Sequence, residues 1–181
     1  FQSDPCVYVL KAADGIVVVG VFVDDLIFCG SDIAGVRAIR SALAERFSTK
    51  GLGKLTHYLG IEVDQSDGSI VLSQRQYVDK ILAAFNMTDC NPVSEPLSPS
   101  LRLTKSMCPS TDAERERMKE YPVRQAIGAL MYLSICTRPD ISHSVRDVAR
   151  FCSNPGFEHW QAVQRIFRYV RGTRDLSLRY S

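Results

Sequence analysis

The clearest hydrophobic pattern lies near the N-terminus, where two short apolar runs flank an acidic pair. The runs are Ile16-Val17-Val18-Val19-Gly20-Val21 and Leu26-Ile27-Phe28-Cys29, with Gly15 and Gly30 outside them. Short runs of β-branched and aromatic residues between turn residues are typical of buried strands. The sequence therefore predicts a hairpin with Phe22-Val23-Asp24-Asp25 at its turn.

The elements on either side of this hairpin extend the prediction to residues 1–50. The run from Cys6 to Lys11 predicts a third strand, and Ala13-Asp14-Gly15 predicts the turn that joins it to the hairpin. Ser31 or Asp32 can then cap a helix. The apolar positions of that helix recur at helical spacing, at Ile33, Val36, Ile39, Leu43 and Phe47. We expect three strands followed by a helix that packs on one face of the sheet.

Residues 51–90 predict a second hairpin and a helix. The runs from Tyr58 to Val63 and from Ser69 to Leu72 flank Gln65-Ser66-Asp67-Gly68, which has the composition of a turn. Ser73 and Gln76 have the spacing of a capping box. The sequence therefore predicts that a helix begins there and ends near Asn86.

The rest of the chain predicts a linker and three helices. Residues 91–120 contain four prolines among many serines and threonines, which favours an irregular linker across the surface. Helical spacing follows from Tyr121 to Cys136, from Asp140 to Cys152 and from Glu158 to Arg171. In the last helix, one face carries Trp160, Val163, Phe167 and Val170.

The C-terminal residues are basic. Residues 161–181 contain five arginines and one aspartate, a net charge of +4. Such a tail suits a surface that faces phosphates, but taken alone the pattern favours arginines on a solvated helix face. The whole chain has a formal net charge of only +2, which does not by itself indicate nucleic-acid binding.

Length and composition indicate a folded domain. The chain has 181 residues, 45% of them hydrophobic, which is enough for a core. It begins with Phe1 rather than methionine, and residues 176–181 look like an interrupted strand, so we expect a piece of a longer protein. The longest apolar run is far shorter than the roughly 20 residues of a membrane span, and no membrane role is expected.

The six cysteines are scattered, without a C-x-x-C pair or a histidine at zinc-site spacing. They predict buried or free thiols in a reducing compartment, the cytosol or the nucleus. His57, His143 and His159 form no pattern typical of a ligand set or of the base of a nucleophile. We therefore expect His159, beside Trp160, to be structural.

Asp24 and Asp25 are the residues most suggestive of chemistry. A carboxylate within an apolar segment is costly unless it is paired or binds metal, so the adjacent pair suggests a Mg²⁺ or Mn²⁺ site. Aspartate is also common in turns, so a solvated hairpin turn is the alternative. The dipeptide alone does not decide between them.

A longer series of motifs resembles the C-terminal part of the reverse transcriptase of copia-type long-terminal-repeat retrotransposons. Residues 16–30 are similar to that family's Y-V-D-D hairpin, and Leu59-Gly60-Ile61-Glu62-Val63 is similar to its L-G-I-E-V segment. The series continues in family order with Leu72-Ser73-Gln74, Tyr77, Lys80-Ile81-Leu82, Phe85, Met87, Pro92-Val93, Ile127-Gly128, Leu130-Met131-Tyr132-Leu133, Thr137-Arg138-Pro139-Asp140-Ile141, His159-Trp160, Arg168-Tyr169 and Gly172-Thr173.

The resemblance implies an α+β fold, a partial polymerase palm with an antiparallel sheet and packed helices, followed by a thumb and a helical connection region. The palm would occupy residues 1–50. Residues 51–90 would form a primer-grip-like hairpin and the start of the thumb, and 91–120 the linker. Residues 121–181 would form the helical thumb or connection region, leading toward a ribonuclease H domain that this chain lacks.

The resemblance also implies RNA-directed DNA polymerisation by two-metal nucleotidyl transfer. The cofactor would be two Mg²⁺ (or Mn²⁺) ions, with Asp24 as the main ligand and Asp25 in a supporting role. Phe22 stands where the family usually has tyrosine, so its ring would lie near the primer terminus without the hydroxyl.

Several other residues would contact the template-primer. Tyr58, Leu59 and Gly60 would lie in the hairpin that grips the primer, and Arg165 and Arg168 would approach the nucleic-acid backbone. The implied partners are an RNA/DNA template-primer, a dNTP, and the fingers, ribonuclease H and integrase parts of the polyprotein. The implied location is the virus-like particle of the element in the cytoplasm, or the nucleus.

The chain lacks parts that the family needs for polymerisation. It begins after the upstream metal-binding aspartate and the fingers, so we expect it to be inactive alone. Gly51 replaces a frequent acidic residue, and Glu95-Pro96 replaces the usual Thr-Pro. One alternative is a non-catalytic remnant that folds and at most binds nucleic acid. Another two-metal palm enzyme, such as a cyclase, is disfavoured by the motifs after residue 50.

Overall fold

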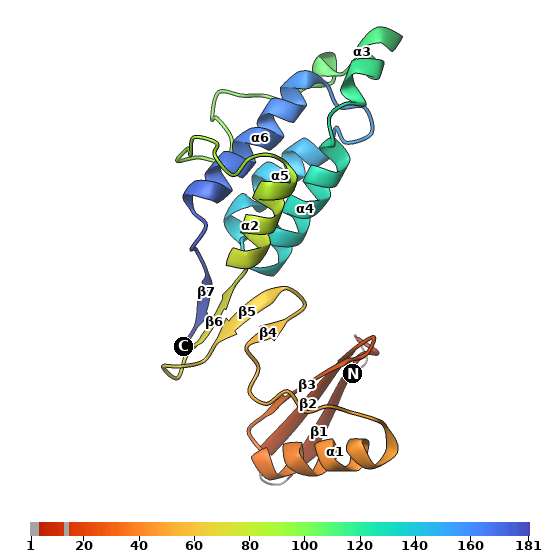
Figure 1. Ribbon diagram of the computed structural model, residues 1–181, viewed down its shortest axis with the longest axis vertical. Helices are drawn as coiled ribbons and strands as arrows, with labels where there is room; N and C mark the ends of the chain where they lie inside the picture. The colour runs from red at the N-terminus through yellow and green to blue at the C-terminus, as the bar shows by residue number, and fades with distance from the viewer. Residues whose placement is uncertain (1–3, 13–14) are drawn as a thin grey trace. The chain divides into compact units, whose positions relative to one another are not determined.

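The computed structural model describes residues 4–12 and 15–181. The chain divides into two compact units, Phe1–Gly53 and Lys54–Ser181, and each is described by itself (Figure 1). Both units combine an antiparallel sheet with helices, so the chain is a mixed α+β protein.

The N-terminal unit is built on three antiparallel strands in the order β1-β2-β3. They are β1 (Val7–Ala12), β2 (Gly15–Phe22) and β3 (Asp25–Gly30). Phe22 pairs with Asp25, so only two residues separate β2 from β3. The predicted hairpin and its neighbouring strand are confirmed. The predicted turn at Ala13 and Asp14 lies outside the described residues.

Helix α1 (Ile33–Arg46) follows the sheet as predicted. The Asp32 carboxylate accepts a hydrogen bond from the Gly35 amide at 2.8 Å and caps the helix. A Cβ atom at Gly35 would lie 3.0 Å from the Val17 side chain, so the glycine allows the helix to approach the sheet closely.

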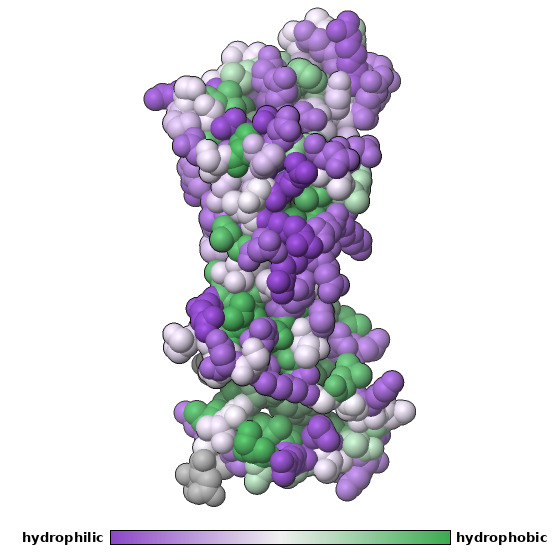
Figure 2. Space-filling model, turned by 60° about the vertical axis from the view of Figure 1, so that its left-hand side comes forward, coloured by the Kyte–Doolittle hydropathy of each residue, from purple (hydrophilic) through white to green (hydrophobic). Residues whose placement is uncertain are grey.

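The N-terminal unit buries few apolar side chains. Among its described residues only Val17 and Val19 are buried hydrophobics. Figure 2 shows hydrophobic residues at the surface of this unit. The most exposed large ones are Tyr8, Leu10, Phe22, Val23, Ile33, Phe47 and Leu52. The unit therefore has a small core of its own.

The C-terminal unit contains a four-stranded antiparallel sheet in the order β4-β5-β6-β7. Its strands are β4 (His57–Tyr58), β5 (Ile61–Asp64), β6 (Ile70–Ser73) and β7 (Leu178–Tyr180). The prediction of one continuous strand from Tyr58 to Val63 is wrong, because Leu59 (φ 49°) and Gly60 (φ 76°) turn the chain between β4 and β5. A second hairpin, β5-β6, forms as predicted.

Four helices pack together to form the core of this unit (Figure 1). They are α2 (Arg75–Ala84), α4 (Val123–Cys136), α5 (Ser142–Ala149) and α6 (Phe157–Gly172). The predicted apolar face of the last helix is confirmed, since Trp160, Val163, Phe167 and Val170 are all buried. No helix in the described ranges has the length and apolar character needed to cross a membrane.

The predicted capping box at Ser73 and Gln76 is wrong. Helix α2 begins at Arg75, and its N-cap residue Gln74 makes no side-chain capping bond. Instead Glu62, on strand β5, accepts the Gln76 amide at 2.9 Å. A carboxylate from a neighbouring strand thus accepts a hydrogen bond from a backbone N–H group at the N-terminus of α2. The Ser73 hydroxyl donates toward the same carboxylate.

The segment 91–120 is more ordered than a surface linker. It contains a 3₁₀ helix, η1 (Lys105–Met107), and helix α3 (Asp112–Met118). Thr111 and Glu114 form a capping box at the start of α3. Three leucines from the segment, at positions 97, 101 and 103, pack against the helical core.

The six cysteines are free thiols, as predicted, with Cys6 and Cys29 exposed and the others half-buried. His159 is buried, and its ring stacks on Phe151 with centroids 4.2 Å apart. Its Nδ1 atom accepts the Gly156 amide at 2.9 Å. These contacts give His159 the structural role expected from the sequence.

Candidate active site

The acidic turn is formed by Val23 and Asp24, and Asp25 begins strand β3. Val23 has a backbone φ angle of 51°, and 83% of its surface is exposed. A β-branched residue in this left-handed region is strained by about 1–3 kcal/mol. Because Val23 is so exposed, little packing compensates for the strain, and the turn presents Asp24 to its surroundings.

Asp24 and Asp25 are both exposed, and neither carboxylate has a hydrogen bond or ion pair within the described part of the chain. Adjacent, unpaired carboxylates supply hard oxygen ligands of the kind that Mg²⁺ prefers. The described residues contain no group of three or more potential ligands close enough to hold a metal ion. The pair therefore fits part of a metal site and requires further ligands.

An apolar pocket of about 820 Å³ lies within the N-terminal unit. Strands β1, β2 and β3 line it with Leu10, Val19 and Leu26, and α1 lines it with Leu43. Asp24 also contributes to its lining. The acidic turn thus borders apolar surface.

Tyr58, Leu59 and Gly60, predicted to contact the primer, lie together at the β4-β5 turn. The hydroxyl of Tyr132, on α4, donates a hydrogen bond to the Leu59 carbonyl. The Tyr132 ring packs edge-on against Tyr77 of α2, with centroids 5.0 Å apart. Two helices therefore fix this turn, and Tyr132 is a residue whose role the sequence did not reveal.

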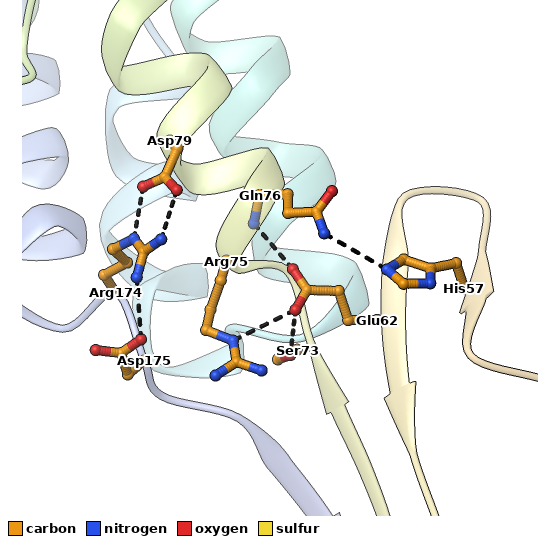
Figure 3. A network of polar contacts seen from close by, with 8 residues as sticks. All are labelled: His57, Glu62, Ser73, Arg75, Gln76, Asp79, Arg174 and Asp175. Atoms are coloured by element: carbon orange, nitrogen blue, oxygen red, sulfur yellow. Dashed lines mark hydrogen bonds and ion pairs between the residues drawn. The ribbon is translucent and has the colours of Figure 1, made fainter.

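Glu62 connects the same hairpin to helix α2 (Figure 3). Besides the Gln76 amide, it binds the Arg75 guanidinium at 3.3 Å. Burial raises the pKa of Glu62, but the Gln76 hydrogen bond and the Arg75 charge outweigh burial and lower that pKa. His57 lies close by, with its Nε2 atom 3.5 Å from the Gln76 side-chain nitrogen. Glu62 is therefore ionised at neutral pH and holds the hairpin on the helix.

We expect Glu62→Ala to lower the free energy of unfolding by about 1–2 kcal/mol, because it removes the acceptor that caps α2. Glu62→Gln is the control, since it keeps an acceptor oxygen and loses only the charge. The folded-state pKa is lowered, so the stabilisation by the charge is complete above pH 4.5 and is lost as the pH falls through the folded value. Urea unfolding at pH 7 and pH 3 measures both effects. Equal stability of wild type and Glu62→Ala at pH 7 would contradict this role.

Arg165 and Arg168 lie one turn apart on α6. The Nε atom of Arg168 donates to the Asn91 carbonyl at 2.6 Å, and Arg171 donates to the Cys90 carbonyl. The Nε atom of Arg165 is buried without a partner in the described residues. Arg168 and Arg171 thus hold the loop after α2 in place. The contact of Arg165 and Arg168 with the template-primer stays a prediction.

The other tail arginines are paired with carboxylates. Arg174 binds Asp79 through two hydrogen bonds of 2.5 Å, and Arg179 binds Asp67. These contacts neutralise part of the predicted basic tail. They also anchor strand β7 and the segment before it to the rest of the C-terminal unit.

The structure gathers the predicted site residues at three places. Phe22, Asp24 and Asp25 share the β2-β3 turn of the N-terminal unit. Within the C-terminal unit, residues 58–60 form the β4-β5 turn, whereas Arg165 and Arg168 lie on α6.

Comparison with known proteins assigns the family. The family model "Reverse transcriptase (RNA-dependent DNA polymerase)" matches residues 2–99. The chain is 41% identical over 174 residues to the "Retrovirus-related Pol polyprotein from transposon TNT 1-94" of Nicotiana tabacum, covering 94% of this chain and 13% of that protein. It is 38% identical over 172 residues to the "Retrovirus-related Pol polyprotein from transposon RE1" of Arabidopsis thaliana, covering 94% of this chain and 11% of that protein. No solved structure matches.

These matches agree with the motifs in the sequence. The family model covers more than half of the chain, including the acidic turn and the β4-β6 sheet strands. The similarity to the transposon polyproteins extends over nearly all of it, and the chain spans only a small part of their length. The resemblance to copia-type elements is thereby confirmed, and the chain belongs to the reverse transcriptase (RNA-dependent DNA polymerase) family as a homologue of retrotransposon Pol polyproteins.

Proposed function

We propose that this chain is the C-terminal half of the palm, the primer-grip hairpin and the thumb of an RNA-directed DNA polymerase. The observation that carries the proposal is the exposed, unpaired Asp24-Asp25 pair on a strained turn inside the matched segment. Its substrates would be a template-primer and a dNTP. The remainder of the polyprotein would supply the fingers, ribonuclease H and integrase, within the virus-like particle of the element.

Asp24 and Asp25 would hold the divalent cofactor, Mg²⁺ or Mn²⁺. When bound, such ions lower the pKa of the attacking hydroxyl and stabilise the charge on the leaving pyrophosphate. The pairing of Phe22 with Asp25 fixes the start of strand β3, and the left-handed backbone of Val23 fixes Asp24 at the apex. The half-exposed ring of Phe22 offers an apolar surface beside these carboxylates for a base or sugar of the primer.

We expect the 181-residue chain alone to extend no primer, because its acidic turn supplies two carboxylates and a two-metal site needs more. The test compares this chain with a longer protein, called the extended polypeptide. The extended polypeptide contains this chain and the residues encoded on either side of it in the same reading frame. Both are assayed for Mg²⁺-dependent extension of a DNA primer on an RNA template.

Activity of the extended polypeptide, without activity of the isolated chain, supports the proposal. Extension by the isolated chain would show that the site is complete without further ligands and would contradict that part of the account. A reading frame closed by stop codons, or an extended polypeptide that is folded but inactive, would contradict polymerase function.

The second candidate is a non-catalytic remnant that folds and at most binds nucleic acid. Phe22 in place of the usual tyrosine, and Gly51 in place of an acidic residue, are the departures that favour it. Steeply salt-dependent binding of nucleic acid by the extended polypeptide, without metal-dependent chemistry, would select this candidate.

A further inference from the structure

A second pocket, of about 400 Å³, lies in the C-terminal unit, and its mostly apolar lining includes two cationic side chains, Lys105 and Arg150. One wall is the segment from Lys105 to Ser110, which includes the 3₁₀ helix η1. The other wall is the segment from Arg150 to Asn154, directly after helix α5. The pocket thus combines two cationic side chains with the hydroxyl of Ser153.

Contacts between the two segments hold the walls in place. The Asn154 side-chain amide donates to the Pro109 carbonyl at 3.3 Å. Gly156 approaches the Met107 carbonyl so closely that a Cβ atom at Gly156 would lie 1.7 Å from its oxygen. The buried His159 then fixes the Gly156 amide. These contacts join the chain around the two walls within the protein itself, so the spacing of the walls does not depend on a ligand.

Arg150 is oriented by an aromatic ring. Its guanidinium carbon lies 5.5 Å from the centroid of the Phe151 ring, and that ring is buried and stacked on His159. The ring occupies one face of the guanidinium and leaves its N–H edge available for hydrogen bonds. Within the described ranges, neither Arg150 nor Lys105 forms a salt bridge or a side-chain hydrogen bond.

One carboxylate lies close to this pocket. Glu114 accepts hydrogen bonds from the Ser110 amide and hydroxyl, at 2.8 and 3.1 Å, and from the Thr111 amide at 3.0 Å. Hydrogen bonds from Thr111 and Ser110 lower the pKa of Glu114 to about 2. Glu114 is therefore ionised and caps helix α3, and within the described part of the chain it forms no salt bridge with Lys105 or Arg150.

We propose that this pocket binds a phosphate group of a nucleic-acid backbone through Lys105 and Arg150. Two cations that form no salt bridge in the described ranges, with the Ser153 hydroxyl beside them, match the charge and the acceptor oxygens of a phosphodiester. The inference rests on the proposed function, because that function supplies nucleic acid as the substrate. It concerns residues of the C-terminal unit that neither the family motifs nor the predicted template contacts include.

The test measures binding of a fluorescently labelled RNA–DNA hybrid to the 181-residue chain, by anisotropy over a range of KCl concentrations without divalent metal. We expect Lys105→Ala and Arg150→Ala each to weaken binding about fivefold to tenfold at low salt. Each should also reduce the slope of log affinity against log salt by about one. Arg102→Ala is the matched control, since it removes an exposed cation from the segment between α2 and α3 that belongs to none of the family motifs, and it should change affinity less than twofold.

Three results would overturn the proposal. Unchanged affinity of the two pocket variants, or equal losses in all three variants, would show that the pocket is not a phosphate contact. Displacement of the hybrid by millimolar inorganic phosphate at matched ionic strength would assign the pocket to small anions. Absence of binding by the wild-type chain would also refute it. Because the assay uses neither metal nor dNTP, each of these failures is separate from the outcome of the primer-extension test.

Discussion

Asp24→Asn is expected to lower the rate of primer extension by the extended polypeptide on the order of 10³-fold, because the metal ions lose a charged ligand. Each tenfold loss of rate corresponds to roughly 1.4 kcal/mol of transition-state stabilisation. The substitution removes the negative charge that a metal ion needs and keeps the shape of the side chain. Asp24 is exposed on a turn and has no partner in the described chain, so the fold should tolerate the change. Steady-state extension of a primer on an RNA template measures the effect.

Two further variants make this experiment specific. Asp25→Asn should also reduce the rate, by a smaller factor, because the family resemblance gives Asp25 a supporting role. Asp89→Asn is the matched control, because Asp89 is exposed and makes no side-chain hydrogen bond or ion pair among the described residues. Its rate should equal that of the wild type. Wild-type activity of Asp24→Asn would remove this carboxylate from the chemistry.

Arg138→Ala is expected to destabilise the C-terminal unit by about 3 kcal/mol, the lower end of the cost of breaking a buried ion pair, because the Asp140 side chain is 33% exposed. The Arg138 side chain is 2% exposed and forms two hydrogen bonds to the Asp140 carboxylate, at 3.0 and 2.8 Å. It also donates to the backbone carbonyl and the hydroxyl of Thr173, at 3.0 and 2.6 Å. One guanidinium therefore joins the end of α4 to the end of α6.

Removal of Arg138 would leave Asp140 half-buried, with the Tyr169 hydroxyl as its remaining side-chain donor among the described residues. Burial raises the pKa of Asp140, and the Arg138 contact more than reverses this effect, so the pKa is lowered in the folded protein. The stabilisation by this pair is therefore present above the ordinary aspartate pKa and is lost as the pH falls through the folded value. Urea unfolding at pH 7, followed by the fluorescence of the buried Trp160, measures the loss.

Arg174→Ala is the matched control for this experiment. Arg174 also forms two hydrogen bonds to one aspartate, Asp79, but the two side chains are 40% and 50% exposed. Exposed ion pairs contribute little because water already solvates and screens both charges. We expect a much smaller loss for Arg174→Ala than for Arg138→Ala. Equal losses would contradict the claim that burial makes the Arg138 pair important.

The sequence predicted those elements whose signals are local. The two apolar runs and the intervening acidic pair specify the β2-β3 hairpin, and Asp32 caps α1 with its own side chain. The helical spacing from Trp160 to Val170 likewise specifies the buried face of α6. Each of these features depends on residues close together in the chain, so periodicity and capping rules suffice to find it.

Features that depend on distant residues could not be predicted. The cap of α2 comes from Glu62, thirteen residues before Arg75, and depends on how strand β5 meets the helix. Strand β7 pairs with β6 across about a hundred residues of sequence. The turn at Leu59 and Gly60 lacks the Asn-Gly or Asp-Gly signal that usually marks a two-residue hairpin loop. The α2 cap and the β6-β7 pairing depend on contacts between residues far apart in the chain, which local sequence patterns do not reveal.

The same distinction applies to the candidate site. Asp24 and Asp25 could be found from residue type and position alone, whereas Tyr132 is important only because the chain brings it to the Leu59 carbonyl. Lys105 and Arg150 are 45 residues apart in the sequence and face one pocket only in the folded unit. No spacing rule connects residues of that kind.

The number of metal ions bound at the acidic turn decides whether Asp24 and Asp25 are metal ligands. Electron paramagnetic resonance measures the Mn²⁺ bound by the extended polypeptide in the presence of a template-primer and a non-hydrolysable dNTP analogue. We expect two Mn²⁺ ions per polypeptide for the wild type, and fewer for Asp24→Asn. Two ions in both proteins, or none in either, would contradict the assignment of Asp24 and Asp25 as metal ligands of a polymerase.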